Sequence, residues 1–132
     1  MKRIYVTLLF ILIPIILFAD NIENLSCLPV PFSPFQNENL LKIRYSLRYE
    51  SEVIINIFTL TGEIVYSKRY PKGAGDATAG IDRGTRIGIK WDGKNNDGRY
   101  VADGGYIVQI RAIPDSGKEE VKYVKILVIK DK

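Results

Sequence analysis

The chain has 132 residues, 26% of them charged, and a formal net charge of +4. This length supports one domain. Without the N-terminal Lys2 and Arg3, the chain has 17 basic and 15 acidic side chains, and this nearly balanced charge does not indicate nucleic-acid binding. The sequence contains no histidine, and this excludes histidine-based triads, histidine metal sites and the commonest general base.

Residues 1–19 have the layout of a secretory signal peptide, with a basic start, an apolar run and the small residue Ala19 at the end. The run spans about 16 residues, fewer than the roughly 20 that a helix needs to cross the hydrocarbon core. Pro14 would also kink such a helix. We predict a signal helix that is removed after Ala19, which places the mature chain in the periplasm, on the outer surface or outside the cell. An uncleaved membrane anchor is the alternative, because residues 17–19 only half fit the small-x-small rule for cleavage.

Residues 20–28 are expected to form a short linker, followed by one domain over residues 29–130. Cys27 is the only cysteine, so no intrachain disulfide can form. In an exported chain a lone cysteine raises the question of lipid attachment, but residues 24–26 resemble a lipoprotein cleavage box only loosely. The favoured role for Cys27 is that of a small buried residue in a first strand.

The first part of the expected domain reads as an extended segment and three strands. Three prolines in residues 28–35 suit an edge strand or an extended lead-in. Leu41–Leu47 alternates apolar and polar residues, as a half-buried strand does. Residues 53–60 are apolar on both faces except at Asn56 and Thr59, which predicts a central strand. After a turn at Thr61–Gly62, residues 63–70 are expected to form the second arm of a hairpin.

The second part contains a loop and three more strands. Residues 72–85 are rich in Gly and Ala and have no period, which predicts a long connection between two sheets. Strands are expected at residues 86–91, 106–113 and 120–129, with a turn at 114–117. Six or seven short strands in this length predict an all-β fold, an antiparallel β-sandwich.

The segment WDGKNNDGRYVADGGY, residues 91–106, is the candidate site for metal binding or catalysis. In the helix-loop-helix calcium pattern that starts at Asp92, Lys94 takes a ligand position and Asp97 the position of the glycine. A less regular calcium site would use Asp92, Asn95, Asp97 and Asp103. Paired carboxylates could serve glycoside hydrolysis, but a small domain with a filled core leaves little room for a saccharide cleft.

A structural interpretation accounts for more of this segment. Asp92 can accept hydrogen bonds from the N–H groups of the loop that follows a strand, and residues 96–98 suit a tight turn. Residues 104–105, both glycine, permit a bulge before the next strand, and Trp91 would cap the core. We therefore predict that the acidic side chains hold backbone, and we expect neither catalytic residues nor a cofactor.

The sequence resembles the Ig-like domain of the FlgD type, a family that includes the C-terminal part of the flagellar hook-capping protein. The resemblance runs from PFSPF through KIRYSL and VIINIFTLTGEIV to IKWDGKNNDGRYVADGGYIVQIRA and covers nearly the whole mature chain. Ser33–Pro34 and Thr59 depart from the family pattern. The residues that carry the resemblance as a structural signature are Trp91, Asp92, Gly93, Gly98, Gly105, Tyr106 and Gly62. The resemblance implies an Ig-like or fibronectin-III-like sandwich that docks, anchors or spaces and performs no catalysis.

Two classes of function follow from these observations. The first is an exported, non-catalytic module for protein–protein interaction, assembly or surface anchoring in the bacterial envelope. Its partner would be a protein, bound by strand addition near Pro31 or through the loop 72–85. The chain would contact a membrane only through an uncleaved N-terminus. The second is a calcium- or carbohydrate-binding accessory domain. Its aromatic candidates are Tyr49, Tyr66, Tyr70 and Tyr100.

Two further alternatives remain open. A flagellar hook-assembly scaffold would fit the resemblance, but the hook-capping protein has an N-terminal hook-binding region and no cleavable leader. A subunit of an enzyme whose catalytic domain lies on another polypeptide would also fit.

Overall fold

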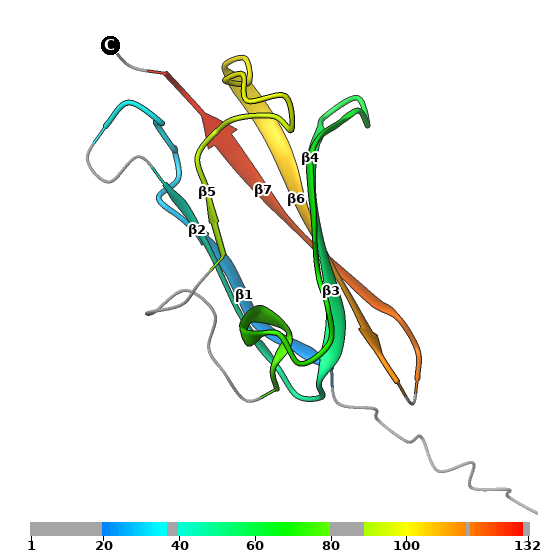
Figure 1. Cartoon of the computed structure of the whole chain (residues 1–132). Coiled ribbons are helices and arrows are strands. Elements are labelled where there is room, and N and C mark those ends of the chain that lie inside the picture. The colour runs from blue at the N-terminus through cyan, green and yellow to red at the C-terminus, as the bar shows by residue number, and fades with distance from the viewer. Residues whose placement is uncertain (1–19, 37–39, 80–88, 116, 131–132) are drawn as a thin grey trace, which may run out of the picture.

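The computed structural model describes residues 20–36, 40–79, 89–115 and 117–130, so the predicted signal helix at 1–19 lies outside the described residues. Within them, two antiparallel sheets face one another (Figure 1). One sheet has the order β1 (Ile22–Leu28), β2 (Leu41–Leu47), β5 (Ile89–Trp91). The other has the order β4 (Ile64–Tyr70), β3 (Ser51–Thr59), β6 (Gly104–Pro114), β7 (Glu120–Val128). The predicted all-β antiparallel sandwich of about seven strands is confirmed.

The core lies between the sheets and follows the alternation of the strands. In β2, Leu41, Ile43, Tyr45 and Leu47 are all buried, as the pattern predicted. Strand β3 pairs with both β4 and β6, which confirms its central position. Burial of each large apolar side chain contributes roughly 1.5–3 kcal/mol, so these alternating rows supply most of the force that holds the sheets together.

The segment 20–28, predicted as a linker, contains strand β1, and this prediction was wrong. Strand β1 pairs with β2 from Ile22 to Leu28, with a register shift between Glu23 and Ser26. Asn24 adopts a positive φ of 56° within this shift, which breaks the alternation that would mark a strand. The role predicted for Cys27 is confirmed, since it is buried in β1, and burial raises the pKa of its thiol to about 12.

The proline-rich lead-in covers an edge of the larger sheet. Phe32 forms a parallel bridge with Val128, its N–H donates to Leu127 O at 2.8 Å, and its carbonyl accepts from Ile129 N at 2.9 Å. This pairing agrees with the predicted extended segment. It also means that the backbone next to Pro31 is paired within the chain, at the place where we expected an edge open to a partner strand.

The predicted loop 72–85 is described as far as residue 79. It contains a short 3₁₀ helix, η1 (Gly75–Ala77), whose Ala77 is fully buried against the core. The described part is therefore anchored to the core at Ala77, and the rest of the predicted loop lies outside the described residues. No helix in the described residues is long and apolar enough to span a membrane.

Candidate functional site

Trp91, at the end of β5, closes one end of the core. It is 1% exposed, and its ring centroid lies 5.9 Å from that of Phe32, 6.2 Å from that of Tyr66 and 6.4 Å from that of Tyr106. Its indole N–H donates to Lys94 O at 2.8 Å, so the one polar atom of the ring is satisfied. The predicted capping role of Trp91 is confirmed, and the ring also fixes the loop that follows it.

Three of the four side chains proposed as calcium ligands, those of Asp92, Asn95 and Asp103, accept hydrogen bonds from the backbone, whereas Asp97 takes part through its backbone N–H. Asp92 Oδ1 accepts from Lys94 N at 3.0 Å, which confirms the predicted Asx-type turn. Asn95 Oδ1 accepts from the N–H groups of residues 97 and 99, both at 3.0 Å, and Asp103 Oδ1 accepts from Lys130 N at 2.9 Å. In the described part of the chain, no three acidic or cysteine side chains stand together as metal ligands would. The geometry therefore favours turn closure over calcium binding.

Asn96 pairs with the backbone of strand β4, a contact that its place in the sequence did not predict. Its Oδ1 accepts from Ser67 N at 2.8 Å and its Nδ2 donates to Ser67 O at 3.1 Å. Its own N–H donates to Val65 O at 3.3 Å. These bonds engage backbone groups of β4, which is an edge strand, so the loop after β5 covers part of the edge that faces away from β3. From the sequence, Asn96 could be identified only as a turn-forming residue, because no local pattern indicates its contact with Ser67, 29 positions away.

The signature glycines have separate structural reasons. Gly93 and Gly98 have φ values of +82° and +80°, which favour glycine. A Cβ on Gly93 would lie 3.1 Å from Pro34 Cβ, so the lead-in packs directly on this turn. Gly62 also has a positive φ, in the predicted β3–β4 turn. A Cβ on Gly105 would lie 3.0 Å from Leu60 Cδ1, which places the Leu60 side chain over the backbone of β6.

Tyr106 ties the beginning of β6 to the preceding loop. Its hydroxyl donates to Ala102 O at 2.5 Å, and its ring packs on Trp91. Burial, with a smaller contribution from Asp103, raises the pKa of its phenol. The hydroxyl thus stays protonated as a donor.

The tyrosines proposed for carbohydrate binding do not form one platform. Tyr66 and Tyr70 pack against the core. Tyr49 follows β2, whereas Tyr100 lies beyond β5 at the opposite end of the sandwich. Tyr100 packs edge-on against Phe35, with ring centroids 4.9 Å apart. A saccharide could not stack on all four rings at once.

The outer face of the four-stranded sheet carries a polar row with one residue from each strand. Ser67 Oγ donates to Asn56 Oδ1 at 2.6 Å, and Asn56 Nδ2 donates to Gln109 Oε1 at 2.9 Å. Gln109 Nε2 donates to the hydroxyl of Tyr123 at 3.3 Å. The register places these residues opposite one another across β4, β3, β6 and β7. We call these four residues the polar row.

Next to the polar row lies an apolar patch, defined by Phe58, Leu60, Ile64, Ile107 and Leu127. Phe58 pairs with Ile64 on one side and with Ile107 on the other, and Leu127 pairs with the glycine that Leu60 overlies. Leu60 is 56% exposed, Ile64 58% and Leu127 40%. Three of the five side chains are therefore exposed, whereas Phe58 and Ile107 between them are half-buried, and Lys125, opposite Ile107, lies at the rim.

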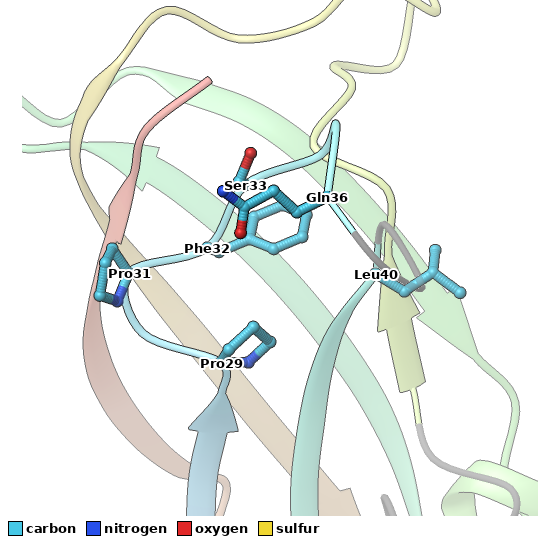
Figure 2. Close-up of a pocket in the computed structure, with 6 residues that line it drawn as sticks. All are labelled: Pro29, Pro31, Phe32, Ser33, Gln36 and Leu40. Atoms are coloured by element: carbon cyan, nitrogen blue, oxygen red, sulfur yellow. The ribbon is translucent and has the colours of Figure 1, made fainter. Parts of the chain in front are cut away.

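A shallow hollow of about 150 Å³ lies in the segment that connects β1 and β2 (Figure 2). Its lining residues are Pro29, Pro31, Phe32, Ser33, Gln36 and Leu40. The lining offers one hydroxyl and one amide side chain but no titratable group, which is too little chemistry for a catalytic site.

No protein-family model and no curated protein matches the chain. Among solved structures, the chain is similar to dimeric latent PorU from Porphyromonas gingivalis, with a TM-score of 0.58 and 20% identity over 81% of this chain. The match covers only 9% of PorU. The chain is also similar to CopC from Methylosinus trichosporium OB3b, with a TM-score of 0.46 and 14% identity over 83% of this chain and 97% of that one. The likeness to PorU concerns the fold alone. The chain is a β-sandwich, and the FlgD-type resemblance stays a prediction.

Proposed function

We propose that the chain is an exported, non-catalytic β-sandwich module that binds a protein partner in the bacterial envelope, for assembly or surface anchoring. The observation that carries this proposal is the apolar patch on the outer face of the four-stranded sheet. Neighbouring exposed apolar side chains rimmed by polar residues are a feature of many protein interaction surfaces. The polar row beside the patch supplies the polar rim that protein interfaces generally have.

Both edges of the same sheet are partly covered within the chain, which favours its outer face over its edges as the contact surface. Phe32 occupies the edge of β7, and Asn96 occupies the edge of β4 at Ser67. Lys68 and Arg69, farther along β4, are exposed charged residues of the kind that discourages strand addition. Docking on the face therefore needs no backbone rearrangement, whereas strand addition at these positions would first displace pairs within the chain.

The non-catalytic part of the proposal is supported by the use of the carboxylates. Asp92 and Asp103 accept hydrogen bonds from the backbone, and Arg111 pairs with Glu119, whose pKa is lowered mainly by that hydrogen bond. A catalytic acid would instead need a raised pKa and a cleft that holds a substrate.

Photo-crosslinking from the patch tests the proposal. A photoreactive amino acid at Ile64 in the full chain, expressed in the native host, is expected to give a discrete adduct identifiable by mass spectrometry. The matched control places the same group at Lys90, which is exposed on the other sheet. A second control adds Leu60→Lys, which should abolish the adduct from position 64. Equal adducts from both positions, or an adduct insensitive to Leu60→Lys, would contradict the proposal. Size-exclusion chromatography with light scattering would show whether the partner is a second copy of the chain.

A further inference from the structure

Glu120 lies where the mature chain is predicted to begin. It is the first residue of β7, and its Oε2 accepts hydrogen bonds from Asn21 N at 2.6 Å and from Ile22 N at 3.3 Å. Its other carboxylate oxygen, Oε1, is buried and has no hydrogen-bond partner among the described residues. Lys122 Nζ is 3.6 Å from Oε1, which is too long for a hydrogen bond. A buried carboxylate oxygen without a donor costs free energy, so this position favours an additional donor.

The nearest cation is already used by other acceptors. Lys122 Nζ donates to Ile22 O at 2.6 Å and to Asp20 Oδ2 at 3.0 Å. Burial lowers the pKa of Lys122, but Asp20 and Glu120 together outweigh this effect and raise it. The ammonium of Lys122 is thus held toward β1 and Asp20, and Glu120 Oε1 remains open to a different donor.

The backbone just before β1 is held firmly. Asn21 is buried, its Nδ2 donates to Ser51 Oγ at 2.9 Å, and its Oδ1 accepts from Tyr49 N at 2.8 Å. Consecutive backbone nitrogens are at most about 3.7 Å apart. The Asp20 nitrogen therefore lies within about 6 Å of Glu120 Oε2 and close to the carboxylate whose other oxygen, Oε1, has no donor within the described part of the chain.

We propose that Glu120 is the acceptor for the amino terminus that forms when the leader is removed, so that processing itself adds an ion pair between the first residue and β7. Hydrolysis of the bond between Ala19 and Asp20 consumes one water and leaves a carboxylate on Ala19 and an ammonium on Asp20. That ammonium brings three N–H donors and a positive charge next to the open oxygen of Glu120. The inference rests on the proposed export of the chain.

The pairing has a defined pH dependence. The α-amino group has an ordinary pKa of about 7.7–8.0. In the proposed pair, we expect the carboxylates of Glu120 and Asp20 to raise this pKa in the folded chain and Lys122 to oppose them. Arg48, the other cation near Asp20, is paired with Glu23. A group whose folded pKa is raised stabilises the fold below its unfolded pKa and loses that effect as the pH rises through the folded pKa. The stabilisation is therefore present at pH 6.5 and absent at pH 10.

Four full-length precursors, exported and processed in a bacterial host, test the inference. They are the natural chain, a chain with Gly-Ser inserted between Ala19 and Asp20, Glu120→Gln, and the combination of both changes. Intact mass gives the N-terminus, expected at Asp20 in the two chains without the insertion and at the inserted glycine in the other two. The insertion moves the ammonium away, so the Tm at pH 6.5 should fall by about 3 °C in the natural background and by less than about 1 °C in the Glu120→Gln background. At pH 10 the insertion should have no effect in either background.

The outcomes separate export from pairing. A chain that keeps residues 1–19, or begins elsewhere, overturns both the export prediction and the inference. A chain that begins at Asp20 but whose Tm responds equally to the insertion in both backgrounds overturns the pairing alone. Should Glu120→Gln fail to fold, the natural chain gives a second measurement by NMR titration of its ¹³C-dimethylated amino terminus. A pKa above the ordinary range supports the pairing, and an unshifted pKa overturns it.

Discussion

The side-chain amide of Asn96 pairs with the backbone of Ser67 in the manner of a neighbouring strand. One amide group accepts from Ser67 N at 2.8 Å and donates to Ser67 O at 3.1 Å, so both edge-facing groups of that residue are satisfied. Unpaired edge strands invite pairing with other chains. The loop therefore protects the β4 edge as well as connecting β5 to β6.

Replacing Asn96 by Ala should expose this edge. We expect a loss of about 0.5–1.5 kcal/mol in the free energy of unfolding, because two hydrogen bonds are lost, together with earlier aggregation on heating. Hydrogen exchange at the Ser67 amide and light scattering during a thermal ramp measure the two effects. Asn96→Asp keeps the acceptor for Ser67 N, so its exchange should stay slower than in Asn96→Ala, and equal exchange in both variants would speak against the pairing.

Trp91→Ala should be among the most destabilising single changes. The ring is 1% exposed and contacts three other aromatic rings, so its removal leaves a large cavity at the end of the core. Urea unfolding should show a loss of about 3–5 kcal/mol. A loss below about 1 kcal/mol would mean that Trp91 is not part of the core.

Gly93 and Gly98 offer a matched pair of substitutions. Both have φ near +80°, but a Cβ on Gly98 meets nothing within 4 Å, whereas a Cβ on Gly93 meets Pro34 and Phe32 at 3.1 and 3.2 Å. Gly98→Ala should cost about 1–2 kcal/mol from backbone strain alone. Gly93→Ala should cost about 2–4 kcal/mol, because overpacking adds to the strain. Equal losses in chemical denaturation would argue against close packing of the lead-in on this turn.

The polar row should be sensitive at its buried centre and tolerant at its exposed end. Asn56 is 7% exposed and bonds to both Ser67 and Gln109, so Asn56→Ala leaves partners unsatisfied and should cost about 1–3 kcal/mol. Tyr123 is 61% exposed, and Tyr123→Phe should change stability by less than about 0.5 kcal/mol. Both values come from denaturant unfolding, and a reversed order would refute this account of the row.

Cys27 should be nearly inert in the folded chain. Burial raises the pKa of its thiol to about 12, so at pH 8 the thiolate fraction is smaller by roughly 1,000-fold than in the unfolded chain. Alkylation by iodoacetamide at pH 8, followed by mass spectrometry, should be slow in buffer and rapid in guanidinium chloride. Rates within about tenfold of each other would show that Cys27 is accessible.

The strands that alternate could be predicted from the sequence, and the pairings between distant segments could not. Leu41–Leu47 shows its inward face through its apolar residues alone. Apart from the place of Cys27 in a first strand, the extent of β1 was not predicted, because its register shift and the positive φ of Asn24 disrupt the period that identifies a strand. The role of Asp92 in closing the turn could be predicted, because an Asx-type turn depends only on residues two positions apart.

The candidate surfaces depend on register, which a single sequence does not display. Phe58, Ile64 and Ile107 become neighbours only through the pairing of three strands. Glu120 meets Asn21 across 99 positions, and nothing near either residue indicates that contact. Local patterns therefore predicted the fold class, whereas the apolar patch and the contact between Glu120 and Asn21 could be found only in the assembled sheets.

The bridges from Phe32 to residues 127–129 and from Asn21 to Glu120 have a consequence for the order of events in folding. Each joins the first part of the sandwich to its last strand, so neither can form until nearly the whole chain is available. Contacts of such long sequence separation slow folding, because the loop between them must close first. During synthesis the lead-in therefore has no partner strand until β7 is present, and pairing with β7 then covers the edge of that strand.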